Sequence, residues 1–267
     1  MSIITISREM AALGDETAKE IAAILGYRCL DKDALEERVQ SYGIEAQKFK
    51  KYDERKPSFF ALLLQDRDEY MHFLRKAVLV EAEKGNCVIV GRGASLILKN
   101  LPGLVSMFLS AKREIRIDRI VKRFGHDEKR AKQIIDKSDR ARGGFYRTFF
   151  GTDWRRPCNY HLSFNTGVFC PKSCAEVVAS FKDRIFTPEA EIKNKTILKD
   201  MLLEHWIRHR VLYEQELPVR FFEAAICAGV ITLRGTVNSR ATLEAVVDCA
   251  SEMAKGATIQ NEMQIIR

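Results

Sequence analysis

The stretch that decides the fold is IITISRE at residues 3–9, followed by MAALG at 10–14 and DETAKEIAAIL at 15–25. The first segment is short, apolar and β-branched, which predicts a buried strand. Two acidic residues suit the first turn of the helix that follows, and Gly26 suits its C-terminal cap. A strand, a turn and a helix N-terminus in this order can hold phosphate, because the first amides of a helix have no partner within it.

Strand and helix patterns continue to alternate beyond this unit. We expect strands at 27–31, 86–94, 104–111 and 162–166, and helices at 70–84 and across 112–140 with a break at Gly125. This alternation predicts an α/β fold with a parallel sheet and helices on both faces.

The pattern changes after a joint at 183–191, where Thr187, Pro188 and Glu189 form a good helix start. The remainder predicts a helix at 189–212, strands at 217–225 and 229–237, a helix at 239–255 and a final strand at 258–266. We therefore expect two domains, at 1–187 and 188–267, the second a small α+β unit.

Composition excludes several classes of protein. The chain has 267 residues, of which 46% are hydrophobic and 30% charged, so it can bury a core and is not disordered. No apolar run approaches the roughly 20 residues of a spanning helix. The cysteine count of seven is odd, and no secretory signal precedes the first strand, which indicates reduced thiols and a cytoplasmic location. Cys170 and Cys174 stand without a second ligand pair, so no metal site is predicted.

Positive charge is concentrated in one segment. Residues 112–156 carry 15 basic and 7 acidic groups, whereas residues 188–267 carry 10 basic and 11 acidic groups. Arg116, Arg119 and Arg123 share one helix face, and Arg140 and Arg142 follow. Planar guanidinium groups suit phosphoryl oxygens, although a solvated helix face has the same pattern. The segment indicates an anionic partner.

Two strand ends are expected to contribute to the same edge of the sheet. Asp31 and Lys32 follow the second strand, and the strand at 87–91 brings Gly91, Arg92 and Gly93 to the same edge. Ligands of open α/β sheets bind at this edge, and two glycines let the backbone approach a ligand while Arg92 reaches an oxyanion. An ordinary strand-to-helix turn is the alternative interpretation of these glycines.

The phosphate loop motif GxxxxGK[ST] is mostly absent from the first turn. The corresponding stretch is SREMAALGDETAK, in which Gly14 remains and the loop contains no lysine. We expect Arg8 to supply the charge that this lysine would bring.

The order ITISRE, LDKD, VIVGRGA, DKSDRARGGFYRTFFGTDW and NYHLSFNTG resembles the cytidylate kinase-like family of P-loop proteins over residues 1–182. The resemblance implies ATP and Mg²⁺ as cofactors and assigns roles by position. It implies that Arg8, Gly14, Asp15, Glu16 and Thr17 bind the cofactor, that Asp31, Lys32, Arg92 and Gly93 bind the substrate, and that Arg119, Arg123, Arg140 and Arg142 form a catalytic lid. Ala11, Ala12 and Leu13 stand where relatives often have glycines, and His161 stands where they more often have Asp.

The segment GVITLRGTV with its following helix and closing strand resembles a BON domain over residues 190–267. The resemblance implies a module that binds phospholipid or a protein partner and has no catalytic residues. His205 and His209 are a possible metal pair, although a helix surface beside Trp206 explains them as well.

Three functions remain open at this point. The first is a phosphotransferase that moves the γ-phosphoryl group of ATP to a nucleoside monophosphate or a similar small acceptor. The second is a degenerate kinase-like protein that binds nucleotide as a sensor, with the BON-like module as its output. The third, nucleic-acid binding through residues 112–156, is the least favoured. The sequence does not predict an oligomeric state.

Overall fold

The computed structural model describes residues 2–42 and 64–266. The chain forms two compact units, residues 1–194 and 195–267, and each is described by itself. The division falls within helix α9 (Pro188–His209), and the expected joint at 187/188 lies at the N-terminal end of this helix. The Thr187 hydroxyl caps α9 by accepting a hydrogen bond of 3.2 Å from the Ala190 amide.

Unit 1 is built on a five-stranded sheet in the order β2-β3-β1-β4-β5, in which every pairing is parallel. The strands are β1 (Ile3–Arg8), β2 (Arg28–Leu30), β3 (Cys87–Val90), β4 (Leu104–Ser110) and β5 (Leu162–Asn165). All residues of β1 are buried, as befits a central strand with both faces covered. Because β1 pairs with β3 on one side and β4 on the other, its C-terminal end is the point where ligands of such sheets bind.

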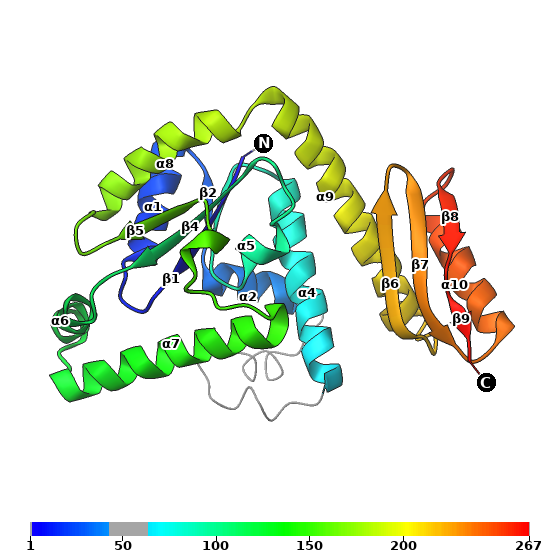
Figure 1. The fold of residues 1–267 in the computed structure, drawn as a ribbon, viewed down its shortest axis with the longest axis horizontal. Coiled ribbons are helices and arrows are strands. Elements are labelled where there is room, and N and C mark those ends of the chain that lie inside the picture. Colours follow the sequence, from blue (N-terminus) through cyan, green and yellow to red (C-terminus); the bar gives the residue numbers. More distant parts are fainter. Residues whose placement is uncertain (1, 43–63, 267) are drawn as a thin grey trace. The chain divides into compact units, whose positions relative to one another are not determined.

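Helices cover both faces of this sheet, as predicted (Figure 1). Helices α1 (Gly14–Leu25) and α8 (Pro171–Ile185) bury Ile21 and Val178 against the sheet residues Ile4 and Val105. Figure 1 shows α4 (Leu64–Glu83) and α5 (Ala94–Ile97) on the other side, and α4 also packs against α2 (Lys32–Ser41). Helices α6 (Arg113–Phe124) and α7 (Glu128–Phe150) follow β4.

Three helical features differ from the sequence expectation. Helices α2 and α8 were not predicted. The apolar period of α2 is weak, whereas α8 is clearly amphipathic and its pattern was overlooked. Helix α7 was expected to end near residue 140, yet it continues through Gly143 and Gly144 to Phe150. The aromatic side chains of Phe145 and Tyr146 are buried there, and their packing outweighs the low helix propensity of the two glycines.

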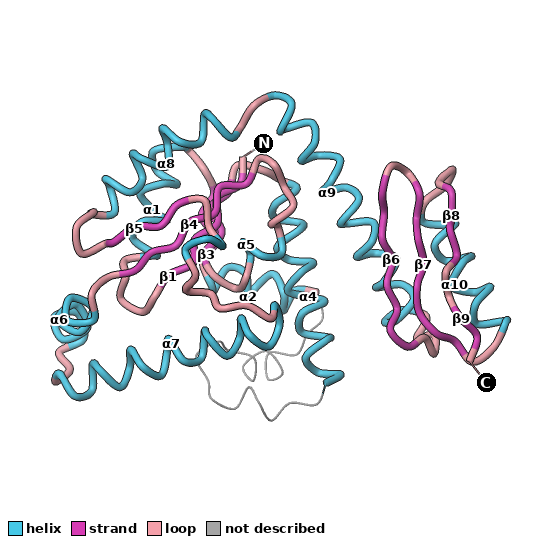
Figure 2. Tube along the Cα trace, in the orientation of Figure 1, coloured by secondary structure: helices cyan, strands magenta, loops and turns pink. Residues whose placement is uncertain are grey.

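Unit 2 contains a four-stranded mixed sheet, whose core is shared with helix α10 and with the C-terminal part of α9 (Figure 2). Its elements after α9 are a π-helical turn (Arg210–Glu214), β6 (Arg220–Cys227), β7 (Val230–Val237), α10 (Arg240–Met253), β8 (Thr258–Asn261) and β9 (Gln264–Ile265). Strand β7 pairs antiparallel with β6 and parallel with both β8 and β9. Ile231, Leu233 and Val246 belong to its core.

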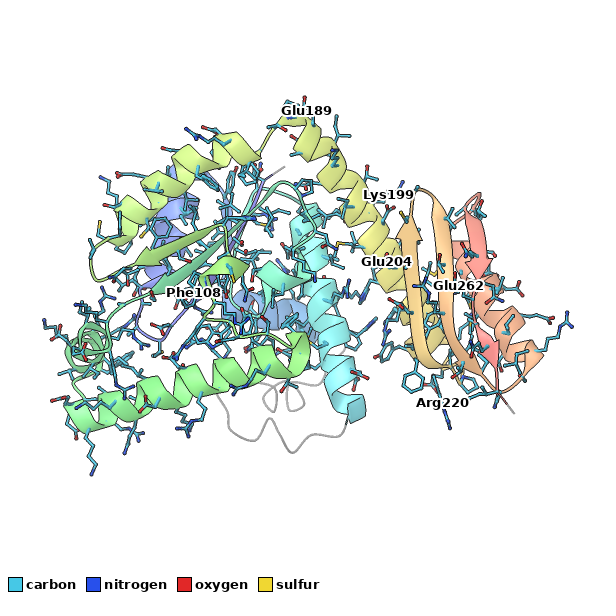
Figure 3. The ribbon with its side chains drawn as sticks, in the orientation of Figure 1. Phe108, Glu189, Lys199, Glu204, Arg220 and Glu262 are labelled. Atoms are coloured by element: carbon cyan, nitrogen blue, oxygen red, sulfur yellow. The ribbon has the colours of Figure 1, made fainter. Side chains whose placement is uncertain are left out.

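Two strands of unit 2 depart from their expected bounds. The strand expected from residue 217 begins at Arg220, and its pairing is irregular around Phe221, which has a φ of 54°. The final strand is divided between Asn261 and Gln264, which lets both halves pair with β7. Two acidic side chains of unit 2 accept hydrogen bonds from its strands (Figure 3). Glu204 accepts from the Ile226 amide at 2.8 Å, and Glu262 accepts from Arg234 at 2.7 Å. Within residues 2–42 and 64–266, no helix is long and apolar enough to cross a bilayer.

The cap of α10 provides a test of unit 2. Ser239 accepts a hydrogen bond of 3.1 Å from the Thr242 amide. We expect Ser239→Ala to lower the free energy of unfolding by about 1 kcal/mol, since one helix amide loses its acceptor. Ser239→Asp keeps an acceptor and is the control. Urea unfolding measures both, and equal losses in the two variants would contradict the cap.

Candidate phosphate-binding site

The turn after β1 has a left-handed backbone at two residues that are not glycine. Ala11 has a φ of 60° and Leu13 a φ of 58°, and Leu13 is the N-cap of α1. Such a conformation costs a non-glycine residue of the order of 1 kcal/mol or more, so the surrounding structure must impose it. The turn therefore has a left-handed backbone at two positions where glycine would be the usual residue.

This curvature leaves a group of backbone donors without acceptors. Within the described residues, none of the amides of Ala11, Leu13, Gly14, Asp15 and Glu16 donates a hydrogen bond, and the Leu13 side chain supplies no cap. We call these N–H groups the open amides. Successive free amides at a helix N-terminus bind anions, because both the donors and the helix dipole favour negative charge.

Arg8 lies directly beside the open amides. Its side chain is only 6% exposed, and its guanidinium is 3.5 Å from the Asp15 carboxylate. A β-carbon placed on Gly14 would come within 2.4 Å of the Arg8 Cγ, so Gly14 is the residue that makes room for this arginine. The structure thus brings Arg8, Gly14 and Asp15 together at the turn.

The other residues expected to bind the cofactor have different partners. The Thr17 hydroxyl is buried and donates a hydrogen bond of 2.7 Å to the Leu13 carbonyl, which stabilises the turn. Glu16 accepts a hydrogen bond of 2.9 Å from Arg123 on α6. Arg119 donates to the Ala11 carbonyl at 3.0 Å and to Thr166 at 2.5–3.1 Å. Two of the four expected lid arginines, Arg119 and Arg123, therefore lie at the turn.

A buried charge network that the sequence reasoning missed joins the turn to α6 and α7. Asp139 accepts a hydrogen bond of 3.0 Å from the Met10 amide, one of 2.6 Å from Arg116 and one of 3.1 Å from Arg155. Glu9 lies 3.4 Å from Arg116 and 3.3 Å from Arg155. These contacts hold the start of the turn in place. Two acidic residues could have indicated this network from the sequence: Glu9, directly after the first strand, and Asp139, within an arginine-rich helix.

Burial raises the pKa of the Glu9 carboxyl. Asp139 adds to this rise, whereas the charges of Arg116 and Arg155 oppose it. Folding therefore strengthens proton binding at Glu9, and the ionised carboxylate lowers stability at neutral pH.

The expected substrate residues form a second cluster at the end of β3. Gly91, Arg92 and Gly93 have φ values of 78°, 54° and 69°. Arg92 is fully buried, forms an ion pair with Glu36 and donates a hydrogen bond of 3.2 Å to the Tyr70 hydroxyl.

Lys32 joins this cluster through Glu36, at 3.2 Å, whereas Asp31 caps α2 by accepting from the Ala34 amide at 2.9 Å. A β-carbon on Gly93 would lie 2.4 Å from the Phe150 ring, so the end of α7 closes over this turn.

The remaining two expected lid residues lie apart from the open amides. Arg142 is buried and donates a hydrogen bond of 2.8 Å to Ser138 on its own helix, and it lies 3.6 Å from Asp139. Arg140 lines a separate cavity on α7, described below. His161, at the position where relatives more often have Asp, accepts a hydrogen bond of 3.1 Å from the Ser106 amide through Nδ1.

A parallel five-stranded sheet with a turn of open amides after its central strand is the arrangement of α/β domains of the phosphate-binding-loop class. The chain belongs to the cytidylate kinase-like family, whose sequence model matches residues 3–168. None of the curated proteins compared with the chain matches it.

Solved structures resemble unit 1. An uncharacterized protein from Eubacterium ventriosum superposes with a TM-score of 0.55 at 22% identity, covering 68% of this chain and 99% of that one. A shikimate kinase from Bacteroides thetaiotaomicron gives a TM-score of 0.43 at 15% identity, covering 68% and 98%. A gluconokinase from Sinorhizobium meliloti gives 0.44 at 15% identity, covering 68% and 94%. At these identities the first comparison establishes the fold alone.

The residues of the turn fit a polyphosphate. The open amides and Arg8 are donors of the kind that bind phosphoryl oxygens. For Mg²⁺, which binds through one or two carboxylates together with substrate phosphates, Asp15 and Glu16 are the available ligands, whereas the Thr17 hydroxyl is turned to Leu13. No group of three or more His, Cys, Asp or Glu side chains gathers around a potential metal position in the described part of the chain.

The Arg8–Gly14 contact predicts the effect of a minimal substitution. We expect Gly14→Ala to destabilise the protein by roughly 1–3 kcal/mol, because the new methyl group overlaps the Arg8 side chain close to its backbone. Glu20→Ala, at an exposed position of the same helix, is the control. Chemical denaturation provides the measurement, and an unchanged midpoint for Gly14→Ala would show that Arg8 does not cross this position.

The raised pKa of Glu9 predicts a pH-dependent effect. We expect Glu9→Gln to be at least as stable as the parent at pH 7, because it removes an ionised carboxylate in an unfavourable environment. This advantage should shrink as the pH falls through the raised pKa toward the ordinary glutamate pKa of 4.5, because the parent then binds its proton.

Asp136→Asn is the control, because we expect it to lower the stability at pH 7, opposite to Glu9→Gln. Arg113 lowers the pKa of Asp136, so the stabilising contribution of Asp136 is present above the ordinary aspartate pKa of 3.8 and is lost as the pH falls through the lowered pKa. Urea midpoints between pH 4 and 8 measure both variants. A large loss of stability for Glu9→Gln at pH 7 alone would contradict the assignment.

Proposed function

We propose that unit 1 binds the phosphates of ATP at the open amides and transfers the γ-phosphoryl group to a nucleoside monophosphate or a similar small acceptor. The observation that carries this proposal is the turn after β1, where free N–H groups and the Arg8 guanidinium converge. The family membership supports it, because a kinase-like fold suggests nucleotide or small-molecule phosphorylation.

The acceptor site is proposed at the second cluster. Lys32, Arg92 and Gly93 lie at the C-terminal edge of the sheet next to β1, with Asp31 at the start of α2. Arg92 and Lys32 share Glu36, which keeps both cations in place before a phosphate arrives. A buried arginine of this kind binds a phosphate with two parallel hydrogen bonds.

The lid arginines divide into two proposed roles. Arg123, exposed and paired with Glu16, is the one placed to exchange its carboxylate for phosphate. Arg119 fixes the Ala11 carbonyl and is a positioning residue for the open amides. When bound, ATP with Mg²⁺ supplies the transferable phosphoryl group, and the acceptor oxygen displaces ADP from the γ-phosphorus.

A nucleotide sensor without catalysis is the second candidate function. It is favoured by the absence of lysine from the turn and by the pairing of Arg116, Arg123 and Arg155 with carboxylates. In that case the turn binds nucleotide. The arginines that would stabilise phosphoryl transfer stay paired with Glu9, Glu16 and Asp139.

For the C-terminal part of the chain, residues 188–267, we propose a BON-like module that contacts a protein or a phospholipid in the cytoplasm. Its support is the order of two strands, a helix and a closing strand around β7. Its slightly acidic composition disfavours purely electrostatic attraction to anionic headgroups.

Calorimetric titration with Mg-ATP tests the proposal. We expect Arg8→Gln to weaken ATP binding at least about tenfold, a loss of roughly 1.4 kcal/mol, because the turn loses its charged donor. Lys19→Gln removes one positive charge from an exposed position of α1 and is the matched control. Circular dichroism establishes that both variants are folded.

ADP release in the presence of nucleoside monophosphates then separates the two candidates. Release that depends on the acceptor supports the phosphotransferase, and ATP binding without release supports the sensor. If the folded parent protein does not bind ATP at millimolar concentration, both are wrong.

A further inference from the structure

A cavity of about 460 Å³ lies beside α7, and the open amides are not among its lining residues. Its walls are α7, the first residue of α6 and the connection at 153–155. Arg113, Asp136, Arg140, Gly143, Arg147 and Trp154 are among the residues that line it. Cavities of this size accommodate small ligands.

Two guanidinium groups in the cavity, those of Arg140 and Arg147, form no ion pair with the residues that the structure describes. Arg113 forms two hydrogen bonds with Asp136, of 2.6 and 2.9 Å, and Arg155 is paired with Asp139 and Glu9. Within the described residues, no carboxylate lies within ion-pair distance of Arg140 or Arg147.

One further acid, Asp153, lines the cavity and accepts a hydrogen bond of 3.1 Å from the Arg155 amide. The cavity therefore carries an excess of positive charge.

Trp154 adds a neutral donor that is fixed in position. The residue is 3% exposed and packs edge-on against Phe108 of β4, labelled in Figure 3, at 5.7 Å between ring centroids. Its carbonyl accepts a hydrogen bond of 2.7 Å from the Tyr160 hydroxyl. The indole N–H has no acceptor among the residues that the structure describes.

Gly143 marks the point where these donors converge. A β-carbon built on Gly143 would lie 3.5 Å from the Trp154 Nε1 and 3.9 Å from the Arg147 Nη2. The glycine thus leaves a space above α7 that two donors from different elements face. An oxygen atom in this space can approach both.

We propose that this cavity binds a phosphate group of a small phosphorylated molecule through Arg140, Arg147 and the Trp154 indole N–H. The two guanidinium groups come from α7 and the indole from the connection that follows it. A tetrahedral oxyanion has acceptor oxygens for donors from both elements, which a planar carboxylate serves less well. None of these three donors belongs to the proposed ATP site.

Occupancy of this site has a route to the turn after β1. Arg155 lines the cavity and also contacts Asp139, and Asp139 holds the Met10 amide. A ligand that draws Arg155 toward the cavity changes one of the hydrogen bonds that fix the turn. The cavity is thus placed to act as an effector site.

Fluorescence titration tests the site directly. In a Trp206→Phe background, Trp154 is the remaining tryptophan of the two in the chain, and its emission reports on the indole environment. Pyrophosphate, inorganic phosphate and glycerol phosphate are the probes, with acetate as the planar anion for comparison. We expect a saturable change with the phosphate compounds and a much weaker response to acetate.

Two sets of variants identify the donors. Arg140→Gln with Arg147→Gln should weaken pyrophosphate binding at least tenfold, whereas Lys129→Gln with Lys137→Gln removes the same charge from exposed positions of α7 without effect. Gly143→Ala should raise the Tm, because alanine favours a helix, and should also weaken binding tenfold by filling the space.

The proposal is overturned if the phosphate compounds cause no change in Trp154 fluorescence. It is also overturned if the two double variants bind pyrophosphate equally well. A Gly143→Ala protein that binds pyrophosphate as the parent does overturns it as well. Arg8→Gln distinguishes this site from the ATP site, since it should leave the Trp154 response intact whatever its effect on ATP. The experiments can therefore contradict the phosphate cavity without contradicting the ATP site, and the reverse.

Discussion

The hydrogen bond between the Met10 amide and the Asp139 carboxylate is the contact on which the rest of the site depends. It joins a turn that follows the first strand to a helix more than a hundred residues later in the chain. Asp139 is buried and also accepts from Arg116 and Arg155, so the helices after β4 and the turn form one charge network. Breaking a buried pair leaves an uncompensated charge, which makes such a network cooperative.

This network explains how the turn keeps its shape without glycine. Ala11 is held on one side by Arg119, which binds its carbonyl, and Met10 is held by Asp139. The left-handed conformations at Ala11 and Leu13 are maintained by these contacts and by the Thr17 hydroxyl on the Leu13 carbonyl. Side chains from α1, α6 and α7 thus impose a backbone path that glycine would adopt on its own.

The sequence predicted the parallel sheet and the position of the turn, because strand periodicity and helix caps are local signals. The family resemblance assigned Arg8 and Gly14 to the same expected site, but not their direct contact. The sequence could not predict Glu36 beside Arg92 or Asp139 beside Met10, since these contacts depend on tertiary packing. The extent of α7 was missed for the same reason, because the burial of Phe145 and Tyr146 decides it.

A turn that uses alanine and leucine in place of glycine has fewer alternative conformations in the unfolded chain and in the folded one. The cost of ordering it is met when the protein folds, so little flexibility remains to be lost when an anion arrives. Such a turn discriminates by fit: it favours a ligand that matches its fixed curvature and adapts poorly to one that does not.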